Sequence, residues 1–342
     1  MRRAKYLFLI CGCVALAFAS RVSGLPQSNN DAAIHFNLGI AYGGQGKLDL
    51  AIGEFRESLR FDPNFADAHL ALGNALVKKG DSDNAIAEFR AAVRLKPENA
   101  EAHLSLGAAL YSKHELDAAA VEYKETLRLS PNHPVAHYDL GLVYYDKGML
   151  DEAIAELRES LRLGRQSMDA HRILGFALGK KGNWEEAITE YQEVLRLHPQ
   201  DAETHNGLAA ALQVKGDLDG AISEFREVAK LNPEDPAIHF NLAAALQTKK
   251  DLDGAIAEYR EALRLSPDPE THYGLATALV AKGDLDKAIS EYREAIRIRP
   301  EFAVGHYGLG LALRDKGNKS EAAKEFAEAT RLDPSLKPPP DQ

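Results

Sequence analysis

A histidine recurs along the chain at intervals of 34 residues, each time within a similar apolar stretch. His69 lies in ADAHLALGNALV, His103 in AEAHLSLGAALY and His137 in PVAHYDLGLVYY. Alignment on these histidines divides the chain into nine units, eight of 34 residues and a seventh of 33. The units are 32–65, 66–99, 100–133, 134–167, 168–201, 202–235, 236–268, 269–302 and 303–336. They cover 305 of the 342 residues, so the fold must be built from copies of one motif.

Each unit contains two short amphipathic segments that are typical of helices. In the first segment Leu106, Gly107 and Leu110 stand at helical spacing, and a glycine such as Gly80 usually follows, which suits the left-handed conformation after a helix end. In the second segment an alanine such as Ala85 stands four residues before an aromatic ring in eight of the nine units. Helices of about 13 residues are marginal alone in water, so stability must come from stacking between units.

The stretch AHLALGNALVKKGDSDNAIAEFRAAVRLKP at residues 68–97 resembles a tetratricopeptide repeat. That family follows the pattern W-x2-L-G-x2-Y, then A-x3-F, then P. The resemblance implies an all-α fold, an α-solenoid in which nine helix-turn-helix units wind into a right-handed superhelix. It also implies that peptide segments of partner proteins bind in the concave groove.

The sequence departs from the family pattern in three ways. Histidine replaces tryptophan at the fourth place of every unit, and alanine replaces glycine at the eighth place of three units (Ala209, Ala243 and Ala276). The fourth unit ends in RLGRQS without the proline that ends the other eight. We therefore expect Gly164 to mark a local bend or a flexible joint.

The recurring histidines could be metal ligands, catalytic bases or packing residues. Two rings would have to lie within about 2.1 Å of one ion to share zinc, whereas packed helices stand 8–10 Å apart. Nine identical catalytic sites are not a reasonable expectation. We expect half-buried neutral rings between helices, each with one nitrogen hydrogen-bonded, so that acid below about pH 6 loosens the array. These residues are His35, His69, His103, His137, His171, His205, His239, His272 and His306.

A glutamate precedes the aromatic position of every second segment. Paired carboxylates can carry out acid–base catalysis, but a repeated acid among arginines is typical of a solvated convex face, which is the interpretation we favour. The nine residues are Glu54, Glu88, Glu122, Glu156, Glu190, Glu224, Glu258, Glu291 and Glu325. Outside the repeats too few residues remain for a catalytic domain, and no nucleotide-binding, hydrolase or zinc-protease motif is present. The sequence predicts no enzyme, no cofactor and no metal site.

The two ends of the chain differ from the repeats. Residues 1–19 combine a basic start, an apolar run at 6–19 and a small-residue cleavage pattern, which predicts a signal peptide cut after residue 19 or as late as 24. An uncleaved membrane anchor at 6–19 is the alternative. Residues 20–31 are expected to be a linker and 337–342 a proline-rich tail. The chain is therefore expected to be exported, to the periplasm or outside the cell. A formal net charge of −10 disfavours nucleic acid as a partner.

In the family, the concave surface is formed by the second, fifth, ninth, twelfth and thirteenth residues of each unit. These positions hold seven acids and four bases, and eight aromatic residues that could anchor a partner or simply cover the next unit. The predicted contact residues are Phe36, Tyr111, Tyr138, Tyr145, Arg172, Phe176, Asn206, Phe240, Tyr273 and Tyr307. The group expected at the centre is Tyr138, Tyr145, Arg172 and Phe176, with Asn206 beside them.

Three functions remain open at this point. The first is an exported scaffold that presents its groove to peptide segments of envelope proteins, in assembly or secretion. The second is a structural array that self-associates through its end units, because the alanine-rich last helix has no capping helix after it. The third is a groove for polysaccharides, since aromatic rings also stack on sugars.

Overall fold

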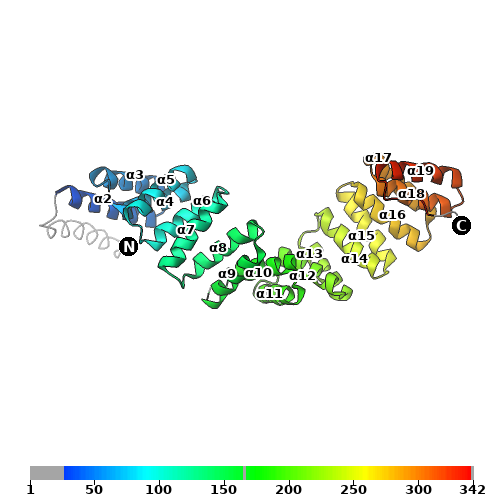
Figure 1. Ribbon diagram of the computed structural model, residues 1–342, viewed down its shortest axis with the longest axis horizontal. Coiled ribbons are helices and arrows are strands. Elements are labelled where there is room, and N and C mark those ends of the chain that lie inside the picture. Colours follow the sequence, from blue (N-terminus) through cyan, green and yellow to red (C-terminus); the bar gives the residue numbers. More distant parts are fainter. Residues whose placement is uncertain (1–26, 165–166, 340–342) are drawn as a thin grey trace, which may run out of the picture. The chain divides into compact units, whose positions relative to one another are not determined.

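The computed structural model describes residues 27–164 and 167–339, so the predicted signal peptide lies outside the described residues (Figure 1). Every regular element in these ranges is a helix. The first helices of the units are α2 (Gln27–Gly44), α4 (Ala66–Lys79), α6 (Ala100–Ser112), α8 (Pro134–Asp146), α10 (Met168–Lys181), α12 (Ala202–Lys215), α14 (Pro236–Thr248), α16 (Pro269–Lys282) and α18 (Ala303–Asp315). The second helices are α3 (Leu48–Phe61), α5 (Ser82–Leu95), α7 (Leu116–Leu129), α9 (Leu150–Arg162), α11 (Trp184–Leu197), α13 (Leu218–Leu231), α15 (Leu252–Leu265), α17 (Leu285–Ile298) and α19 (Lys319–Leu332).

The chain divides into two compact units between Arg165 and Gln166. The first contains α2 to α9 and the second α10 to α19. The division follows Gly164, which has a φ of +92° and lies in the one repeat that lacks its closing proline.

The start of the first helix corrects the expected linker at residues 20–31. Helix α2 begins at Gln27, so residues 27–31 are helical. No residue between 27 and 31 is glycine or proline, so nothing in this stretch interrupts the helix. None of the described helices is long and apolar enough to cross a membrane.

Most first helices end at a residue in the left-handed conformation, which glycine adopts without a steric penalty. Seven glycines take this place with φ between 73° and 91°: Gly46, Gly80, Gly148, Gly182, Gly216, Gly283 and Gly317. In the third and seventh repeats a residue with a side chain must adopt it instead. These are His114, with φ of 59°, and Lys250, with φ of 68°.

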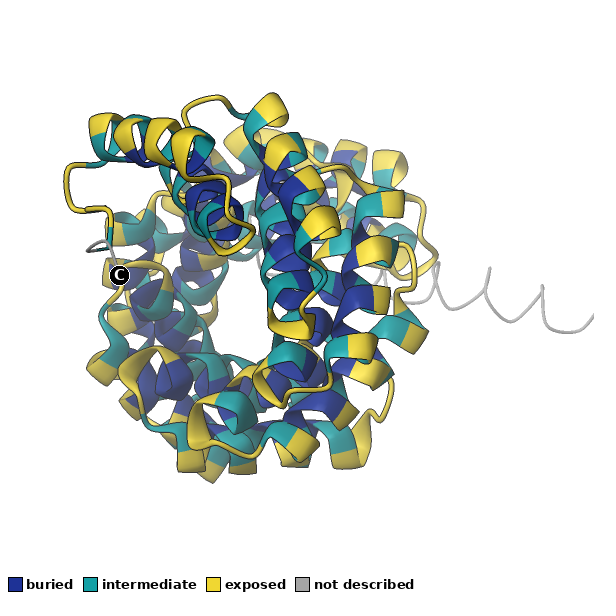
Figure 2. Ribbon diagram, turned by 90° about the vertical axis from the view of Figure 1, so that its right-hand side faces the viewer, coloured by how far each residue is buried: buried dark blue, intermediate teal, exposed yellow. Residues whose placement is uncertain are grey.

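Within each compact unit the helices form a continuous stack. Each first helix packs on its own second helix, and each second helix packs on the next first helix, as α3 does on α4 and α17 on α18. Successive first helices such as α4 and α6 also contact one another, whereas the described second helices do not pack on each other in this way. The first helices therefore line the inner side of a curved stack, as expected for an α-solenoid, and each helix has a buried and an exposed side (Figure 2).

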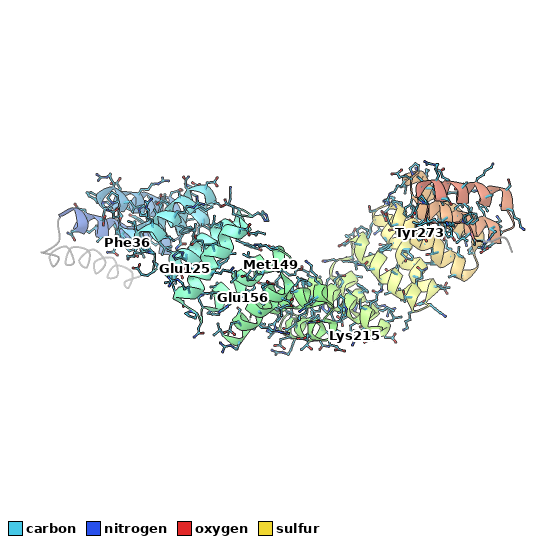
Figure 3. The ribbon with its side chains drawn as sticks, viewed as in Figure 1. Phe36, Glu125, Met149, Glu156, Lys215 and Tyr273 are labelled. Atoms are coloured by element: carbon cyan, nitrogen blue, oxygen red, sulfur yellow. The ribbon has the colours of Figure 1, made fainter. Side chains whose placement is uncertain are left out.

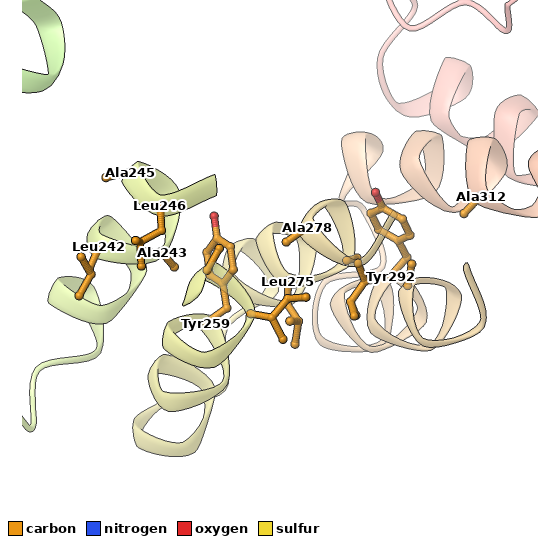
Figure 4. Packing of buried hydrophobic residues seen from close by; sticks show 14 of the residues in the cluster. Leu242, Ala243, Ala245, Leu246, Tyr259, Leu275, Ala278, Tyr292 and Ala312 are labelled. Atoms are coloured by element: carbon orange, nitrogen blue, oxygen red, sulfur yellow. The ribbon is translucent and has the colours of Figure 1, made fainter. Parts of the chain in front are cut away.

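The core is built from alanines that let helices approach and from rings that fill the space beside them (Figure 4). A Cβ atom added at Gly73 would lie only 2.5 Å from the Phe89 ring, so glycine gives that ring its place. Where alanine replaces this glycine, as at Ala243, the aromatic ring of that repeat packs instead against the first helix of the next repeat. Tyr259 lies against Gly274, at which an added Cβ would stand 2.7 Å away.

The same exchange occurs one repeat later, where Ala276 precedes Tyr292 and the ring lies against Gly308. Two of the three alanine substitutions are thus compensated by a glycine in the following first helix. For the third substitution, Ala209, the equivalent position in the following first helix holds Asn241 instead of glycine, and nothing in the structure explains this exception.

A row of ion pairs joins neighbouring repeats at one edge of each compact unit. A lysine at the end of a first helix binds an acid in the first turn of the preceding second helix, as Lys79 binds Asp49 at 2.6 Å. Hydrogen bonding to the lysine holds the pKa of Asp49 below its usual value. Further pairs of this kind are Lys113–Asp83, Lys147–Asp117, Lys215–Glu185, Lys249–Asp219, Lys282–Asp253 and Lys316–Asp286. Exposed pairs of this kind contribute little individually, but both members favour the helix ends that they occupy.

Candidate functional site

The nine recurring histidines are bound to the nine recurring glutamates. In every repeat the histidine Nδ1 lies 2.5–2.7 Å from Oε2 of the glutamate 19 residues later, for example His137 and Glu156. Between 20% and 30% of each glutamate side chain is exposed. The expected packing role of the histidines is confirmed. The interpretation of the glutamates as a solvated convex face is wrong, because each is half-buried against a ring of its own repeat.

The second nitrogen of six histidines also meets an acceptor. Nε2 of His69 donates to the carbonyl oxygen of Pro63 at 3.0 Å, and five further histidines bind the equivalent proline. Each of these rings therefore holds together its own two helices and the loop that precedes them. The equivalent residue before His171 is Arg165, which lies outside the described residues.

In His69 and His239, where both nitrogens face acceptors, this geometry favours the doubly protonated, charged ring. The hydrogen bond to Glu88 raises the pKa of His69, against the opposing effects of burial and of Arg94. Burial opposes the charge of His239 as well, but its bonds to Glu258 and Pro233 outweigh it and the pKa is raised. For His69 and His239 the expectation of a neutral ring that is loosened by acid is therefore wrong in sign.

This arrangement is structural rather than catalytic. Each glutamate is paired with one histidine in one repeat, and the pairs recur in both compact units without converging on a common point. In residues 27–164 and 167–339, no three histidine, cysteine, aspartate or glutamate side chains gather in a way that could hold a metal ion.

The predicted contact residues lie on first helices, where the sequence placed them. All the aromatic ones are partly buried, and several lean on the ring of their own second helix. The centroids of the Phe36 and Phe55 rings are 6.0 Å apart, and those of Tyr273 and Tyr292 are 5.6 Å apart (Figure 3). Equivalent contacts pair Phe176 with Tyr191, Phe240 with Tyr259 and Tyr307 with Phe326. These rings pack within their repeats and keep a partly exposed surface toward the inner side.

In the first compact unit, tyrosines and acids of α6 and α8 form one cluster. The Tyr111 hydroxyl donates to Asp146 Oδ2 at 2.6 Å, which joins the first helices of two repeats. Burial and this bond raise the pKa of Tyr111, and Tyr138 and Asp139 lie close enough to add to the shift. Tyr145 packs on the neighbouring core from the same helix. We call Tyr111, Tyr138, Asp139, Tyr145 and Asp146 the acidic tyrosine cluster.

In the second compact unit, Arg172 on α10 is surrounded by carboxylates. It binds Asp169 at 2.7 Å, Glu203 at 3.1 Å and Asp201 at 3.5 Å, and 20% of its side chain is exposed. Its positive charge is therefore balanced by carboxylates of its own repeat and of the next.

Two other predicted residues lie in the same region of the second compact unit. A Cβ atom at Gly207 would stand 3.1 Å from the Phe176 ring, so α12 lies against this ring, and the neighbouring Asn206 is exposed. Further along, a hollow of about 460 Å³ is lined by apolar atoms of Pro236, Ala237 and Phe240 and by the acids Asp268 and Glu270. Arg299 binds the Glu270 carboxylate at 2.5 Å.

The residues predicted to form one contact centre belong to different compact units. Tyr138 and Tyr145 lie in the first unit and Arg172, Phe176 and Asn206 in the second. Sequence reasoning missed Asp139, Asp201 and Asp268, since none of them occupies one of the five groove positions.

Comparisons with known proteins agree on the repeat family. The model of the cilia and flagella-associated protein 70 C-terminal domain matches residues 15–239, which is 225 of the 342 residues. Two models of the tetratricopeptide repeat match residues 215–279 and 273–336. No curated protein matches the sequence.

Among known structures, YrrB, described as a TPR protein with an unusual peptide-binding site, is 27% identical over 57% of this chain and 97% of its own, with a TM-score of 0.51. Pseudomonas aeruginosa PilF is 24% identical over 61% of this chain and 95% of its own, with a TM-score of 0.53. The C-terminal part of a TPR protein from Cytophaga hutchinsonii is 17% identical over 67% and 95%, with a TM-score of 0.59. The last two show the likeness of the fold alone.

Proposed function

The chain belongs to the tetratricopeptide-repeat family, whose members are protein-interaction scaffolds, and we propose that it binds peptide segments of partner proteins along the inner, first-helix side of its repeats. No enzymatic family is indicated by the comparisons, and the family is generally non-catalytic. The nine histidine–glutamate pairs, the residues closest to a catalytic constellation, are used to hold the repeats together.

The observation that carries this proposal is the acidic tyrosine cluster on adjoining first helices. It combines partly exposed phenol rings with the carboxylates of Asp139 and Asp146. Such a surface suits a peptide with lysine or arginine side chains, which gain from carboxylates and from stacking over aromatic rings. The acids around Arg172 and the hollow beside Phe240 extend the same chemistry to the second compact unit.

Two further points support binding of a peptide. The groove positions carry three more acids than bases, which would attract a basic segment and repel an acidic one. YrrB, which shares 27% of its residues and the same fold, is described as having a peptide-binding site.

We also propose that the chain is exported, with envelope or secreted proteins as its partners. The basic start and the apolar run at 6–19 support export, and both cysteines, Cys11 and Cys13, fall in the segment that would be removed. N-terminal sequencing of the protein recovered from the envelope should give a chain that begins near Ser20. A protein that stays in the cytoplasm with Met1 intact would refute export but leave peptide binding open.

Peptide binding is tested with two fluorescent twelve-residue peptides, one of alternating lysine and leucine and one of alternating glutamate and leucine. We expect the lysine peptide to bind the whole protein and the glutamate peptide to bind at least tenfold more weakly. The double variant Asp139→Asn, Asp146→Asn should weaken binding of the lysine peptide about fivefold or more, because it removes two carboxylates without changing side-chain shape.

The matched control is Glu98→Gln, Glu152→Gln, which makes the same change of net charge at exposed positions away from the first helices. Equal weakening by both double variants would mean that overall charge, and not the acidic tyrosine cluster, attracts the peptide. No binding of either peptide to the wild-type protein would refute the proposal.

A further inference from the structure

One end of the repeat stack is apolar. On α2, the first helix, Ile34 is 43% exposed, Leu38 is 41% exposed and Ala41 is exposed as well. These are the third, seventh and tenth residues of the first repeat, and they form a stripe along one side of the helix. The residues at the same three places are buried in all eight later first helices, as in α4, where they are Ala68, Leu72 and Ala75.

The cause of this difference is the position of α2 in the stack. Every later first helix within a compact unit is packed on the second helix of the preceding repeat, as α4 is on α3. No described helix precedes α2, so its stacking side is uncovered although it keeps the apolar residues of a stacking side. A solenoid that ends in solvent normally has a polar outer face there.

The opposite end has such a polar face. The last second helix, α19, carries Lys319 where seven of the eight earlier repeats have an apolar residue, and exposed Ala323 where seven have isoleucine. Thr330 replaces a residue that is apolar in all eight earlier repeats, and its hydroxyl donates to the carbonyl of Leu336 at 2.7 Å. The C-terminal end is therefore adapted to water and held by the residues that follow it.

From this asymmetry we propose that two copies of the chain pair through the Ile34–Leu38–Ala41 stripe across a two-fold axis. A polar C-terminal end makes a poor partner for an apolar stripe, so a head-to-tail polymer, which would need the two ends to meet, is not formed. No charged residue lies between Ala32 and Gly46, so two stripes meet without like-charge repulsion despite a net charge of −10. His35, the one titratable side chain among these residues besides Tyr42, is already bound to Glu54.

We infer that a second copy, and not the chain's own signal peptide, covers the stripe, and this choice rests on the proposed export. Removal of residues 1–19 leaves seven residues, 20–26, before α2. These residues read SRVSGLP, and Gly24 and Pro26 do not favour a helix that could lie along the stripe.

The size of the stripe predicts a weak dimer. A single helix about 27 Å long and about 10 Å wide offers a few hundred Å², below the roughly 800 Å² per partner of a stable complex. We therefore expect a dissociation constant on the order of micromolar, with monomer and dimer in exchange. In a two-fold pairing the middle of the stripe lies at the axis, so Leu38 of one copy meets Leu38 of the other.

Sedimentation equilibrium of the processed protein between 1 and 200 µM tests the pairing. Wild type should show a monomer–dimer equilibrium, and Leu38→Asp or Leu38→Lys should each weaken it at least tenfold, because a charge would be buried opposite its own copy. An equimolar mixture of the two variants should recover association, which only a face that meets itself can produce. Ala323→Asp at the other end is the matched control and should leave the equilibrium unchanged. Circular dichroism should show unaltered helicity in each variant.

Three outcomes would overturn the proposal. They are a monomer at all concentrations, a dimer indifferent to both Leu38 variants, and a ladder of higher oligomers that Ala323→Asp abolishes. In the unprocessed chain, a disulfide within one molecule between Leu38→Cys and Cys11 or Cys13 would show that the leader covers the stripe, which also refutes pairing. None of these results depends on peptide binding, so failure here is distinct from failure of the proposed function.

Discussion

Replacing Gly73 by alanine should destabilise the protein although alanine is the better helix former. An added Cβ would lie 2.5 Å from Cε1 and 2.7 Å from Cδ1 of Phe89, and that ring is only 1% exposed, so it cannot turn into solvent. Overpacking of this kind costs about 1–3 kcal/mol, while the change from glycine to alanine in a helix gains about 1 kcal/mol. Because the approach is below 3 Å on a rigid ring, we expect a net loss of about 1–2 kcal/mol.

Gly53 provides the matched control because it is an exposed glycine on α3 with no heavy atom within 4 Å of an added Cβ. Gly53→Ala should gain about 0.5–1 kcal/mol. Subtracting the change in unfolding free energy of one variant from that of the other cancels the helix propensity and leaves the cost of overpacking, about 1.5–3 kcal/mol. Urea unfolding followed by circular dichroism measures the difference, and hydrogen exchange of the α4 and α5 amides shows whether the loss lies in the second repeat.

The structure also predicts which second change rescues Gly73→Ala. In the seventh and eighth repeats the ring displaced by alanine lies against a glycine of the next first helix, whereas Ser105 holds this place after Phe89. Ser105→Gly alone should cost about 0.5–1 kcal/mol, but it should be nearly neutral when combined with Gly73→Ala. If Gly73→Ala is as stable as Gly53→Ala, or if the two changes are additive, the assignment of the glycine to ring packing is wrong.

Two further predictions concern stability. The melting temperature should fall as pH rises from 6 to 9, because the pKa values of His69 and His239 are raised in the folded protein. The stability that these two histidines contribute is complete below about pH 6.5 and is lost as pH passes through the folded-state pKa. A melting temperature that is constant or rises over this range would contradict the charged-ring geometry. Lys250→Gly should stabilise the protein by about 0.5–1 kcal/mol in urea unfolding, because Lys250 is held at a φ of 68°. Lys249→Gly, next to it, should destabilise, since Lys249 has an ordinary φ of −73° and binds Asp219.

The sequence was sufficient to predict the helices because their signals are local. Glycines after the first helices, alanine–aromatic spacing in the second and prolines between repeats each act within a few residues, and eight first helices begin at the first residue of their repeats. The pairing of His69 with Glu88 was missed because it depends on how two antiparallel helices are aligned. Its signal was present, since histidine and glutamate recur nine times at a constant separation of 19 residues.

The candidate site could be predicted only in outline. Family geometry placed Tyr111 and Tyr138 on the inner helices, but the contact of Tyr111 with Asp146 depends on the distance between two repeats, which no local pattern encodes. Arg172 was expected to contact a ligand, yet three carboxylates from two repeats surround it. Which of these residues meet a partner stays a prediction.

The unlike ends of the stack constrain how an array of this kind can change in length. A repeat duplicated between two inner repeats finds matching surfaces on both sides, so internal gain or loss of a unit leaves the stacking contacts intact. A repeat appended behind residue 336 would instead meet Lys319, Ala323 and the bond from Thr330 to Leu336, and it could dock only after those positions reverted to apolar residues. Lineages of this protein should therefore vary in repeat number in the interior while keeping the same last repeat.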